Sequence, residues 1–491
     1  MKRGAGSSSV APDGLHRNLI GGEWVGGGDA IDNINPSDTT DNIGSYAQAS
    51  AAEVDTAISA AATAYRSWSA RTAQERADVL DAAGTELLAR QEELGTLLAR
   101  EEGKPLGEAI GEAARTGRTF KYYAGEAIRL GGETLARMRP GIQVGADRVP
   151  IGPVGLITPW NFPLAIPGWK IAPALAYGCT VVFKPANLVP GSAHALAEIL
   201  WRAGLDGGEF NLVMGRGSEV GDRIANASAL AGVSFTGSTG TGARVGQACM
   251  QRGARVQLEM GGKNPIIVLD DADIEQAVKA ATIGAFFQTG QRCTASSRII
   301  VTDAIHDRFV DAMVAHLGTL RVDHALSHDT HIGPAVDQGQ YEQDVEYIRI
   351  GREEGAEIAF GGGVLERETP GYFVSPTLFT GTRNDMRINR EEMFGPIAGV
   401  IRANDYEEAL AIANDTQYGL AASLCTRNAS YMEDFRRRAE AGLVMFNLPT
   451  AGLDYHAPFG GTKASSYGTR EQGTYAREFY TTVKTWYAST D

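Results

Sequence analysis

Residues 154–185, VGLITPWNFPLAIPGWKIAPALAYGCTVVFKP, decide the fold class. Two short apolar runs, VGLI and CTVVFKP, enclose a segment, AIPGWKIAPALAYG, with the length and apolar spacing of a helix. The alternation continues through GSAHALAEILWRAG, FNLVMG, VGDRIANAS and GVSFTG, which ends at residue 237. Short buried strands that alternate with amphipathic helices predict parallel βαβ units in a doubly wound sheet. Ligands of such sheets bind at the carboxyl ends of the strands.

The regions around this stretch extend the α/β pattern. Alanines and leucines at helical spacing predict two surface helices within 51–99 and a further helix over 107–130. A second α/β block begins near residue 262 with IIVLD and continues to about residue 442. The segment 134–148 and the C-terminal TYAREFYTTVKTWY both have strand character, so they could build an intersubunit sheet. Residues 1–15 are predicted to form a flexible tail.

Composition excludes several classes of partner and site for this chain. With 491 residues, two or three domains are expected, and the net charge of −14 argues against a nucleic-acid partner. The four cysteines lie far apart without a C-x-x-C pair, so neither a metal site nor a disulfide framework is predicted, and a reducing cytoplasm fits them best. No stretch has the roughly 18 uninterrupted apolar residues of a membrane span.

One cysteine has surroundings suited to a nucleophile. In 288-QTGQRCTASSR-298, Gly290 permits close backbone approach to Cys293, and Arg292 adds positive charge. The following TASS is expected to open a helix whose N-terminal dipole favours a thiolate. The alternative is a buried structural cysteine, and the other three cysteines, in apolar strand-like or helical runs, favour that interpretation for themselves.

Two polar residues are candidates for acid–base and oxyanion chemistry. Glu259 lies in 256-VQLEMGGKNP-265 between an apolar strand and a Gly-Gly turn, where a carboxylate is costly to bury without a partner. It is either a general base with a raised pKa or a hydrogen-bonded structural acid. Asn161, in 158-TPWNFP-163, could donate its amide to an oxyanion, or it could be a turn residue.

Further motifs suit a nucleotide. The stretch 232-GVSFTGSTGTG-242 sets glycines between a strand and a helix, where backbone N–H groups can meet a phosphate, although its spacing is not G-x-G-x-x-G. Lys184 ends a strand in 183-FKPAN-187, and 391-EEMFGP-396 sets two carboxylates beside Phe394. Each motif is ambiguous by itself.

Taken in order, PWNFP, FKPA, FTGS, LEMGGK, GQRC, EEMFGP and PFGG resemble the aldehyde dehydrogenase superfamily, from about Asn18 to the C-terminus. The resemblance implies that Cys293 is the nucleophile, that Glu259 is the general base, and that Asn161 and the backbone N–H of Cys293 form the oxyanion hole. It implies a nicotinamide dinucleotide cofactor, with Lys184 at the ribose and phosphate, Gly237 and Ser238 at the pyrophosphate, Trp160 at the adenosine side, and Glu392 and Phe394 at the nicotinamide ribose. The remaining cofactor contacts that it implies are Ile157, Thr158, Pro159, Pro185, Ala186, Asn187, Gly217, Phe235 and Thr236.

The reaction implied is oxidation of an aldehyde through a thiohemiacetal and a thioester on Cys293, which Glu259 then helps to hydrolyse. Relatives that release acyl-CoA generally lack this glutamate. The chain departs from the family pattern at two positions. Asn187 stands where NAD-preferring relatives usually carry a glutamate that would repel a 2′-phosphate, so NADP is predicted to be preferred over NAD. Ser466, in 458-PFGGTKASSYG-468, replaces the usual glycine, and no consequence is predicted for it.

A narrower resemblance points to the substrate. The stretches FPLAIPGWKIAPALAYG, FNLVMGRG, TGQRCTASSR and NLPTAGLDYHAPFGGTKASSYG resemble the α-ketoglutaric semialdehyde (2,5-dioxopentanoate) dehydrogenases. A small anionic aldehyde of this kind needs a cation in its tunnel, and Arg292 and Arg115 are the candidates. The other predicted substrate contacts are Phe162, Trp169, Thr294 and Phe459. The alternatives are a broad-specificity, succinic semialdehyde or aromatic aldehyde dehydrogenase, and a catalytically silent binding or structural protein on the same scaffold.

The resemblance also implies a three-part fold. It has a Rossmann-like cofactor-binding domain (16–133 and 150–261), an α/β catalytic domain that carries Cys293 (262–442), and a β-arm for oligomerisation (134–149 and 472–491). Residues 443–471 are expected to return along the substrate tunnel. Relatives with such an arm form dimers or tetramers, so a homodimer or homotetramer is predicted.

Overall fold

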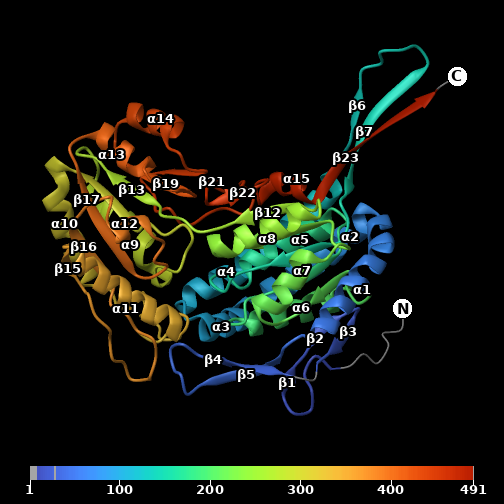
Figure 1. Cartoon of the computed structure of the whole chain (residues 1–491), viewed down its shortest axis with the longest axis horizontal. Coiled ribbons are helices and arrows are strands. Elements are labelled where there is room, and N and C mark those ends of the chain that lie inside the picture. The colour runs from blue at the N-terminus through green and yellow to red at the C-terminus, as the bar shows by residue number, and fades with distance from the viewer. Residues whose placement is uncertain (1–7, 27–28, 490–491) are drawn as a thin grey trace.

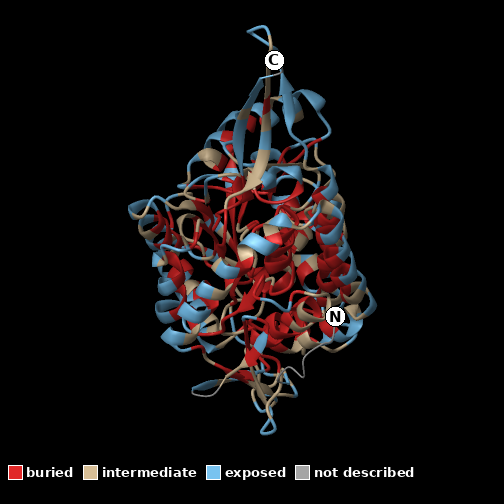
Figure 2. Cartoon of the chain, turned by 90° about the vertical axis from the view of Figure 1, so that its right-hand side faces the viewer, coloured by how far each residue is buried: buried red, intermediate tan, exposed pale blue. Residues whose placement is uncertain are grey.

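The computed structural model describes residues 8–26 and 29–489. Two large sheets lie side by side, each covered by helices, and a narrow arm extends away from the body (Figure 1). Buried residues concentrate inside the body, whereas most of the arm is exposed or half-buried (Figure 2). No helix within the described ranges is both long enough and apolar enough to cross a membrane.

The first sheet contains the stretch that the sequence analysis began with. Its strand order is β22 (Ser466–Tyr467), β12 (Arg255–Glu259), β11 (Gly232–Thr236), β8 (Val154–Ile157), β9 (Val181–Lys184), β10 (Phe210–Leu212), β2 (Asn18–Ile20) and β3 (Glu23–Val25). The five strands from β12 to β10 are parallel, and the edge strands are antiparallel. The chain fills the sheet from β8 through β9 to β10 and then crosses to β11 and β12 on the other side of β8. The order of the strands therefore reverses between β8 and β11, which is where a doubly wound sheet opens a crevice for a ligand.

Helices pack against this sheet and build its core. They are α1 (Ala51–Ala70), α2 (Ala73–Ala89), α3 (Gln91–Glu102), α4 (Leu106–Arg129), α5 (Ala165–Ala176), α6 (Pro190–Arg202), η1 (Gly217–Gly221), α7 (Asp222–Asn226) and α8 (Thr239–Gln251). The region 51–99 holds parts of three helices where two were predicted. Thr72 caps α2 in a capping box with Glu75, and a turn at Arg90 separates α2 from α3. All of α5 is buried, which agrees with its nearly unbroken apolar sequence.

The second sheet follows the loop that contains Cys293. Its strand order is β15 (Glu357–Phe360), β16 (Thr377–Thr382), β17 (Ile397–Ala403), β14 (Arg298–Thr302), β13 (Pro265–Val268), β19 (Ala421–Cys425) and β20 (Leu443–Phe446). Around it lie α9 (Ile274–Phe286), η2 (Phe287–Gly290), α10 (Asp303–Leu317), α11 (Gln338–Glu353), α12 (Arg387–Arg390), α13 (Tyr406–Asn414) and α14 (Ala429–Arg438). Strand β20 pairs with β19, so residues 443–446 belong to this sheet and the return segment begins after them.

The arm is a three-stranded sheet of β6 (Glu133–Leu135), β7 (Ile142–Pro150) and β23 (Thr481–Ser489) (Figure 1). Strand β23 pairs with β7 along its whole length, from Thr481 with Pro150 to Ser489 with Ile142. The C-terminal strand begins later than predicted. Residues 473–480 form η3 (Gly473–Ala476) and α15 (Arg477–Tyr480) on the body. Ala476, Phe479 and Tyr480 are buried there, and that spacing is helical rather than alternating.

The described part of the predicted flexible tail contacts the body. The hydroxyl of Ser9 donates to Glu198 over 2.5 Å, and the backbone oxygen of Ser9 lies 3.2 Å from the ring of His194. Residues 1–7 lie outside the described part of the chain. Strand β1 (Leu15–His16) joins β5 (Asn42–Ala47) and β4 (Ala30–Ile34) in a small sheet, and β18 (Tyr418–Gly419) pairs with β21 (Thr462–Lys463). Ser9 thus contacts the body, and the flexibility of the tail stays a prediction.

Candidate active site

Two cavities meet at Cys293. The first, of about 420 Å³, is lined by Lys104, Glu108, Gly111, Glu112, Arg115, Phe162, Ala165, Ile166, Trp169, Ile283, Phe287, Gln288, Arg292, Cys293, Thr294, Pro449, Ala451, Gly452, Leu453 and Phe459. The second, of about 290 Å³, is lined by Pro159, Trp160, Asn161, Ile166, Thr236, Gly237, Ser238, Met260, Gly261, Cys293, Gln340, Gln343, Glu392 and Phe394. Cys293 and Ile166 line both cavities. The thiol therefore lies where a molecule in one cavity can meet a molecule in the other.

The backbone around Cys293 is held in a conformation that the sequence did not reveal. The side-chain amide of Asn264 donates to the carbonyls of Cys293 and Ala295 over 2.8 and 2.9 Å. Gly290 has a φ of +66°, and a Cβ there would lie 2.1 Å from the carbonyl oxygen of Gly395. Only glycine fits such a close approach. The loop that carries Cys293 is thus fixed from both sides.

The prediction of a helix after Cys293 was wrong. Residues 294–297 are irregular, and strand β14 follows them. Burial raises the pKa of the Cys293 thiol to about 12, and the charges of Glu392 and Glu259 add to the increase. The backbone N–H groups of Cys293 and Thr294 lower this pKa in part. Burial and the two carboxylates therefore favour the protonated thiol over the thiolate.

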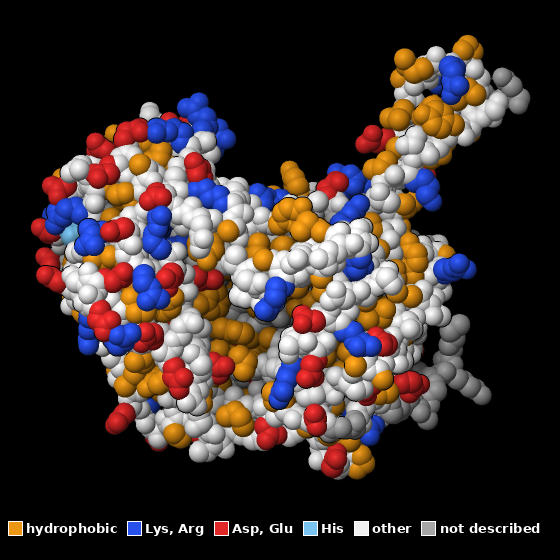
Figure 3. All heavy atoms as spheres, viewed as in Figure 1, with side chains coloured by type: hydrophobic (Ala, Val, Ile, Leu, Met, Phe, Trp, Pro, Cys, Tyr) orange, Lys and Arg blue, Asp and Glu red, His pale blue; other side chains and the backbone are white. Residues whose placement is uncertain are grey.

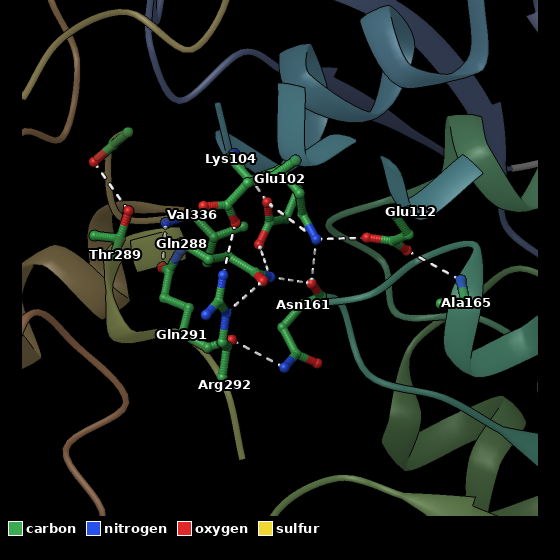
Figure 4. Close-up of polar contacts among 12 residues, drawn as sticks. Glu102, Lys104, Glu112, Asn161, Ala165, Gln288, Thr289, Gln291, Arg292 and Val336 are labelled. Atoms are coloured by element: carbon green, nitrogen blue, oxygen red, sulfur yellow. Dashed lines mark hydrogen bonds and ion pairs between the residues drawn. The ribbon is translucent and has the colours of Figure 1, made fainter. Parts of the chain in front are cut away.

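Asn161 is buried at the wall of the second cavity, and only one of its two amide hydrogens is used in a described hydrogen bond. Its side-chain nitrogen donates to the carbonyl of Gln291 over 2.9 Å, and its exposed fraction is only 2%. An amide nitrogen carries two hydrogens, so the other one remains for a ligand oxygen. The backbone oxygen of Asn161 accepts from Lys104 Nζ over 2.8 Å and from Gln288 Nε2 over 2.5 Å (Figure 4). The loop that presents Asn161 is therefore tied to two other elements.

A buried ionic network lies behind Asn161 (Figure 4). Lys104 Nζ pairs with Glu112 over 2.5 Å, and the other oxygen of Glu112 accepts from the backbone N–H groups of Leu164 and Ala165 over 3.0 Å. Glu102 accepts from the side chain of Gln288 over 3.1 Å and from the backbone of Lys104. Each buried charge has a partner, as a buried ionic network requires. The sequence analysis missed this network, because EEGKP resembles an ordinary polar helix end.

Glu259 ends β12 with 2% of its surface exposed. Burial raises its pKa well above the ordinary value, and the negative charge of Glu471 adds to this. The hydroxyl of Ser466 donates to Glu259 Oε2 over 2.5 Å, whereas Oε1 is buried with no hydrogen-bond partner among the described residues. A carboxyl group with a raised pKa and an uncommitted oxygen is suited to take a proton.

The crevice between β8 and β11 fits a dinucleotide. Pro159, Trp160, Thr236, Gly237 and Ser238 all line the second cavity, and Ser238 is the N-cap of α8, where backbone N–H groups favour a phosphate. The side-chain hydroxyls of Thr158 and Thr236 are buried without a hydrogen-bond partner in the described chain. Ile157 and Phe235, near the ends of their strands, are buried beneath the crevice.

Five other predicted cofactor residues do not line the second cavity: Lys184, Pro185, Ala186, Asn187 and Gly217. Lys184 ends β9 and donates to the carbonyl of the following Pro185, and burial lowers its pKa to about 8. No carboxylate in the described chain lies within ion-pair distance of its amine. Pro185, Ala186 and Asn187 continue from it, and Asn187 donates to Gln48 over 3.1 Å. Gly217 begins η1.

Glu392 lines the second cavity. It accepts from the backbone N–H of Gly262 over 3.0 Å, and burial raises its pKa to about 7. A Cβ at Gly261 would lie 2.0 Å from the carboxyl group of Glu392, so a larger residue at this position would displace that side chain. The ring of Phe394 meets that of Trp160 edge to face at 5.3 Å. These contacts place the 391–396 loop directly over the second cavity.

The six predicted substrate residues all line the first cavity. Trp169 and Phe459 form an apolar wall, with ring centroids 5.4 Å apart. The two arginines differ. Arg292 pairs with Glu108 over 2.8 Å and also donates to Gln288, whereas Arg115 makes one long hydrogen bond, of 3.4 Å, to the side chain of Gln472. Arg115 has no carboxylate partner within ion-pair distance among the described residues.

The fold and the site belong to one class of protein. Residues 24–486 match the Aldehyde dehydrogenase family, and the chain is a member of that family. The predicted fold class and the prediction of an NAD(P)-dependent aldehyde-oxidising enzyme are thereby confirmed.

Two curated relatives and one solved structure show the similarity in detail. The chain is 42% identical to the alpha-ketoglutaric semialdehyde dehydrogenase of Bacillus subtilis, over 97% of this chain and 99% of that protein. It is also 42% identical to the alpha-ketoglutarate semialdehyde dehydrogenase of Haloferax volcanii, over 96% and 99%. The crystal structure of betaine aldehyde dehydrogenase from Staphylococcus aureus in complex with NAD+ superposes with a TM-score of 0.94 and 34% identity, over 97% of this chain and 95% of that one.

Proposed function

We propose that this enzyme oxidises α-ketoglutaric semialdehyde to 2-oxoglutarate, with NADP preferred over NAD. The observation that carries the proposal is the meeting of two cavities at Cys293, one with a partly apolar wall and an unpaired arginine, the other at the nucleotide crevice. The names of the two relatives at 42% identity support this choice of substrate.

The residues around Cys293 supply the steps of the reaction. The Cys293 thiol releases its proton to solvent, and its sulfur forms a bond to the aldehyde carbon as the carbon–oxygen double bond opens. The carbonyl oxygen becomes an oxyanion that accepts from Asn161 and the backbone N–H of Cys293. Pro159, Trp160, Gly237 and Ser238 of the second cavity would hold a nicotinamide dinucleotide, which would supply the hydride acceptor when bound and so would leave a thioester on Cys293. Glu259 then takes a proton from water, the water oxygen attacks the thioester carbon, and the carbon–sulfur bond breaks to release the acid.

Arg115 is the better candidate for the carboxylate of the substrate. A guanidinium binds a carboxylate through two parallel hydrogen bonds, which requires that its donors are not already committed. Arg292 is committed to Glu108, Gln288 and the carbonyl of Ile283. Arg115 is half-buried with a pKa lowered by burial, so an anionic ligand would replace the solvation that it has lost.

The preference for NADP rests on Asn187 and Lys184. Asn187, which follows strand β9, is uncharged. The buried amine of Lys184, at the end of the same strand, is available to a phosphate. Near a protein surface, unit charges about 4 Å apart interact by about 4 kcal/mol, so the absence of a carboxylate matters for a 2′-phosphate.

The arm suggests that the enzyme is a homodimer or homotetramer. It exposes the apolar side chains of Leu135, Met138, Val483 and Tyr487, and the space-filling view shows apolar atoms gathered near its tip (Figure 3). A second copy of the chain would cover such a surface. A cytoplasmic location suits the four cysteines, none of which forms a disulfide in the structure.

Initial rates with purified enzyme test the proposal. α-Ketoglutaric semialdehyde, succinic semialdehyde, pentanal and benzaldehyde are each compared with NADP and with NAD. The highest kcat/KM is expected for α-ketoglutaric semialdehyde with NADP. A higher kcat/KM for pentanal or benzaldehyde would refute the anionic substrate, and a higher value with NAD would refute the cofactor preference.

A further inference from the structure

Ser466 faces the proposed base across a pair of strands. Strand β22 is antiparallel to β12, with Ser466 opposite Glu259 and Tyr467 opposite Leu258. Ser466 and Glu259 are far apart in the chain, yet Ser466 Oγ lies 2.5 Å from Glu259 Oε2. The glycine that the family resemblance implies at this position would have no side chain to make this contact.

The hydrogen-bond pattern fixes the direction of this contact. The backbone N–H of Gly461 donates to Ser466 Oγ over 2.6 Å. A serine hydroxyl has one hydrogen, and the only other partner described for it is Glu259, so that hydrogen points at the carboxyl group. The other carboxyl oxygen, Oε1, has no described partner. One oxygen of Glu259 is therefore fixed and the other is left to react.

The charged groups nearby do not provide an equivalent contact. Lys170 on α5 donates to Glu471 and, over 2.7 Å, to Ser234, while Arg470 donates to the carbonyl of Gly461. Glu471 adds negative charge close to Glu259. These groups act on Glu259 through space, and Ser466 is the only described side chain that donates to it.

We propose that Ser466 is a positioning residue that orients Glu259 and favours its ionised form for the hydrolysis of the thioester. The proposal rests on the proposed role of Glu259 as general base. A hydrogen bond to the charged form of an acid lowers its pKa, and here it counteracts the increase caused by burial and by Glu471. Without Ser466, Glu259 would remain protonated up to a higher pH, and thioester hydrolysis would require that higher pH.

The test separates hydrolysis from the earlier steps. S466A and S466G are compared with the unchanged enzyme by rapid mixing, in which the initial burst of NADPH reports thioester formation and thioester decay is followed by acid quench. In both variants we expect the thioester to decay about tenfold more slowly than in the unchanged enzyme at about pH 6, which corresponds to about 1.4 kcal/mol. At about pH 9 the decay rates should be nearly equal. The burst should be unchanged at both pH values. S466T keeps the hydroxyl and should restore the profile.

Tyr467 provides the matched control, because it lies on the same strand with 54% of its surface exposed. Y467A should not change the pH dependence of thioester decay. An S466A profile identical to that of the unchanged enzyme would overturn the role of Ser466, and so would a loss of equal size at every pH. E259Q distinguishes the two proposals: if it turned over without accumulating a thioester, the base role of Glu259 itself would be refuted.

Discussion

The side chain of Asn264 fixes the backbone of Cys293. Its amide nitrogen donates to the carbonyl of Cys293 over 2.8 Å and to that of Ala295 over 2.9 Å, while its oxygen accepts from the backbone N–H of Ala421 over 2.9 Å. One buried amide thus connects the nucleophile loop to two neighbouring strands of the second sheet, β13 and β19. The position of the sulfur depends on this connection as much as on the residues next to it in the chain.

The variant N264A should therefore impair catalysis more than folding. It removes the described partner of the Cys293 carbonyl and one of the two partners of the Ala295 carbonyl, which keeps its bond from the N–H of Ser297, so the loop of Cys293 can shift. Misplacement of a reacting group by about 1 Å costs about a hundredfold in rate, so we expect kcat to fall by about tenfold to a hundredfold. The measurements are kcat, the alkylation rate of Cys293 and the thermal unfolding midpoint.

Asn389 offers a matched control for N264A. It is also buried and donates to a backbone carbonyl, that of Arg383, over 2.9 Å, but none of its described hydrogen bonds reaches the loop of Cys293. N389A should lower the unfolding midpoint while it leaves kcat near the original value. Equal losses of kcat in both variants would mean that Asn264 acts through general stability.

Of the two arginines of the first cavity, only Arg115 should affect the selectivity between anionic and neutral aldehydes when it is replaced. R115A removes an uncommitted guanidinium, so kcat/KM for α-ketoglutaric semialdehyde should fall by about tenfold to a hundredfold, with little change for pentanal. R292A leaves Glu108 without its partner and releases Gln288, so kcat/KM should fall by the same factor for both aldehydes. If R115A reduced the two substrates equally, Arg115 would not be the carboxylate receptor.

The local parts of the fold were predictable from sequence, whereas the hydrogen-bond partners of the candidate site residues were not. The βαβ units follow from apolar runs of strand and helix length between residues 154 and 237. The helix expected after Cys293 fails for a long-range reason: Asn264 captures the carbonyls of Cys293 and Ala295 that such a helix would have used. Ser466 meets Glu259 only through the register of β12 and β22, which no local pattern reveals.

A carboxylate at position 187 should reverse the cofactor preference. N187E introduces a negative charge where a 2′-phosphate is expected, so kcat/KM for NADP should fall by about a hundredfold relative to that for NAD. N187Q has a similar size without the charge and should keep the original ratio. If N187E left the ratio of the two kcat/KM values unchanged, position 187 would not contact the adenosine ribose.

The raised pKa of Cys293 predicts how alkylation depends on pH. With a thiol pKa of about 12, the thiolate fraction grows with each step in pH, so the rate with iodoacetamide should rise about tenfold per pH unit from about pH 7 to about pH 10 without a plateau. The other three cysteines are buried, and C293A should abolish the reaction. Above its pKa of about 7, Glu392 is negative and disfavours the thiolate, so E392Q should lower the pKa of Cys293 and speed alkylation about threefold at about pH 8. A rate that levels off near neutral pH would instead show that the free enzyme already holds a thiolate.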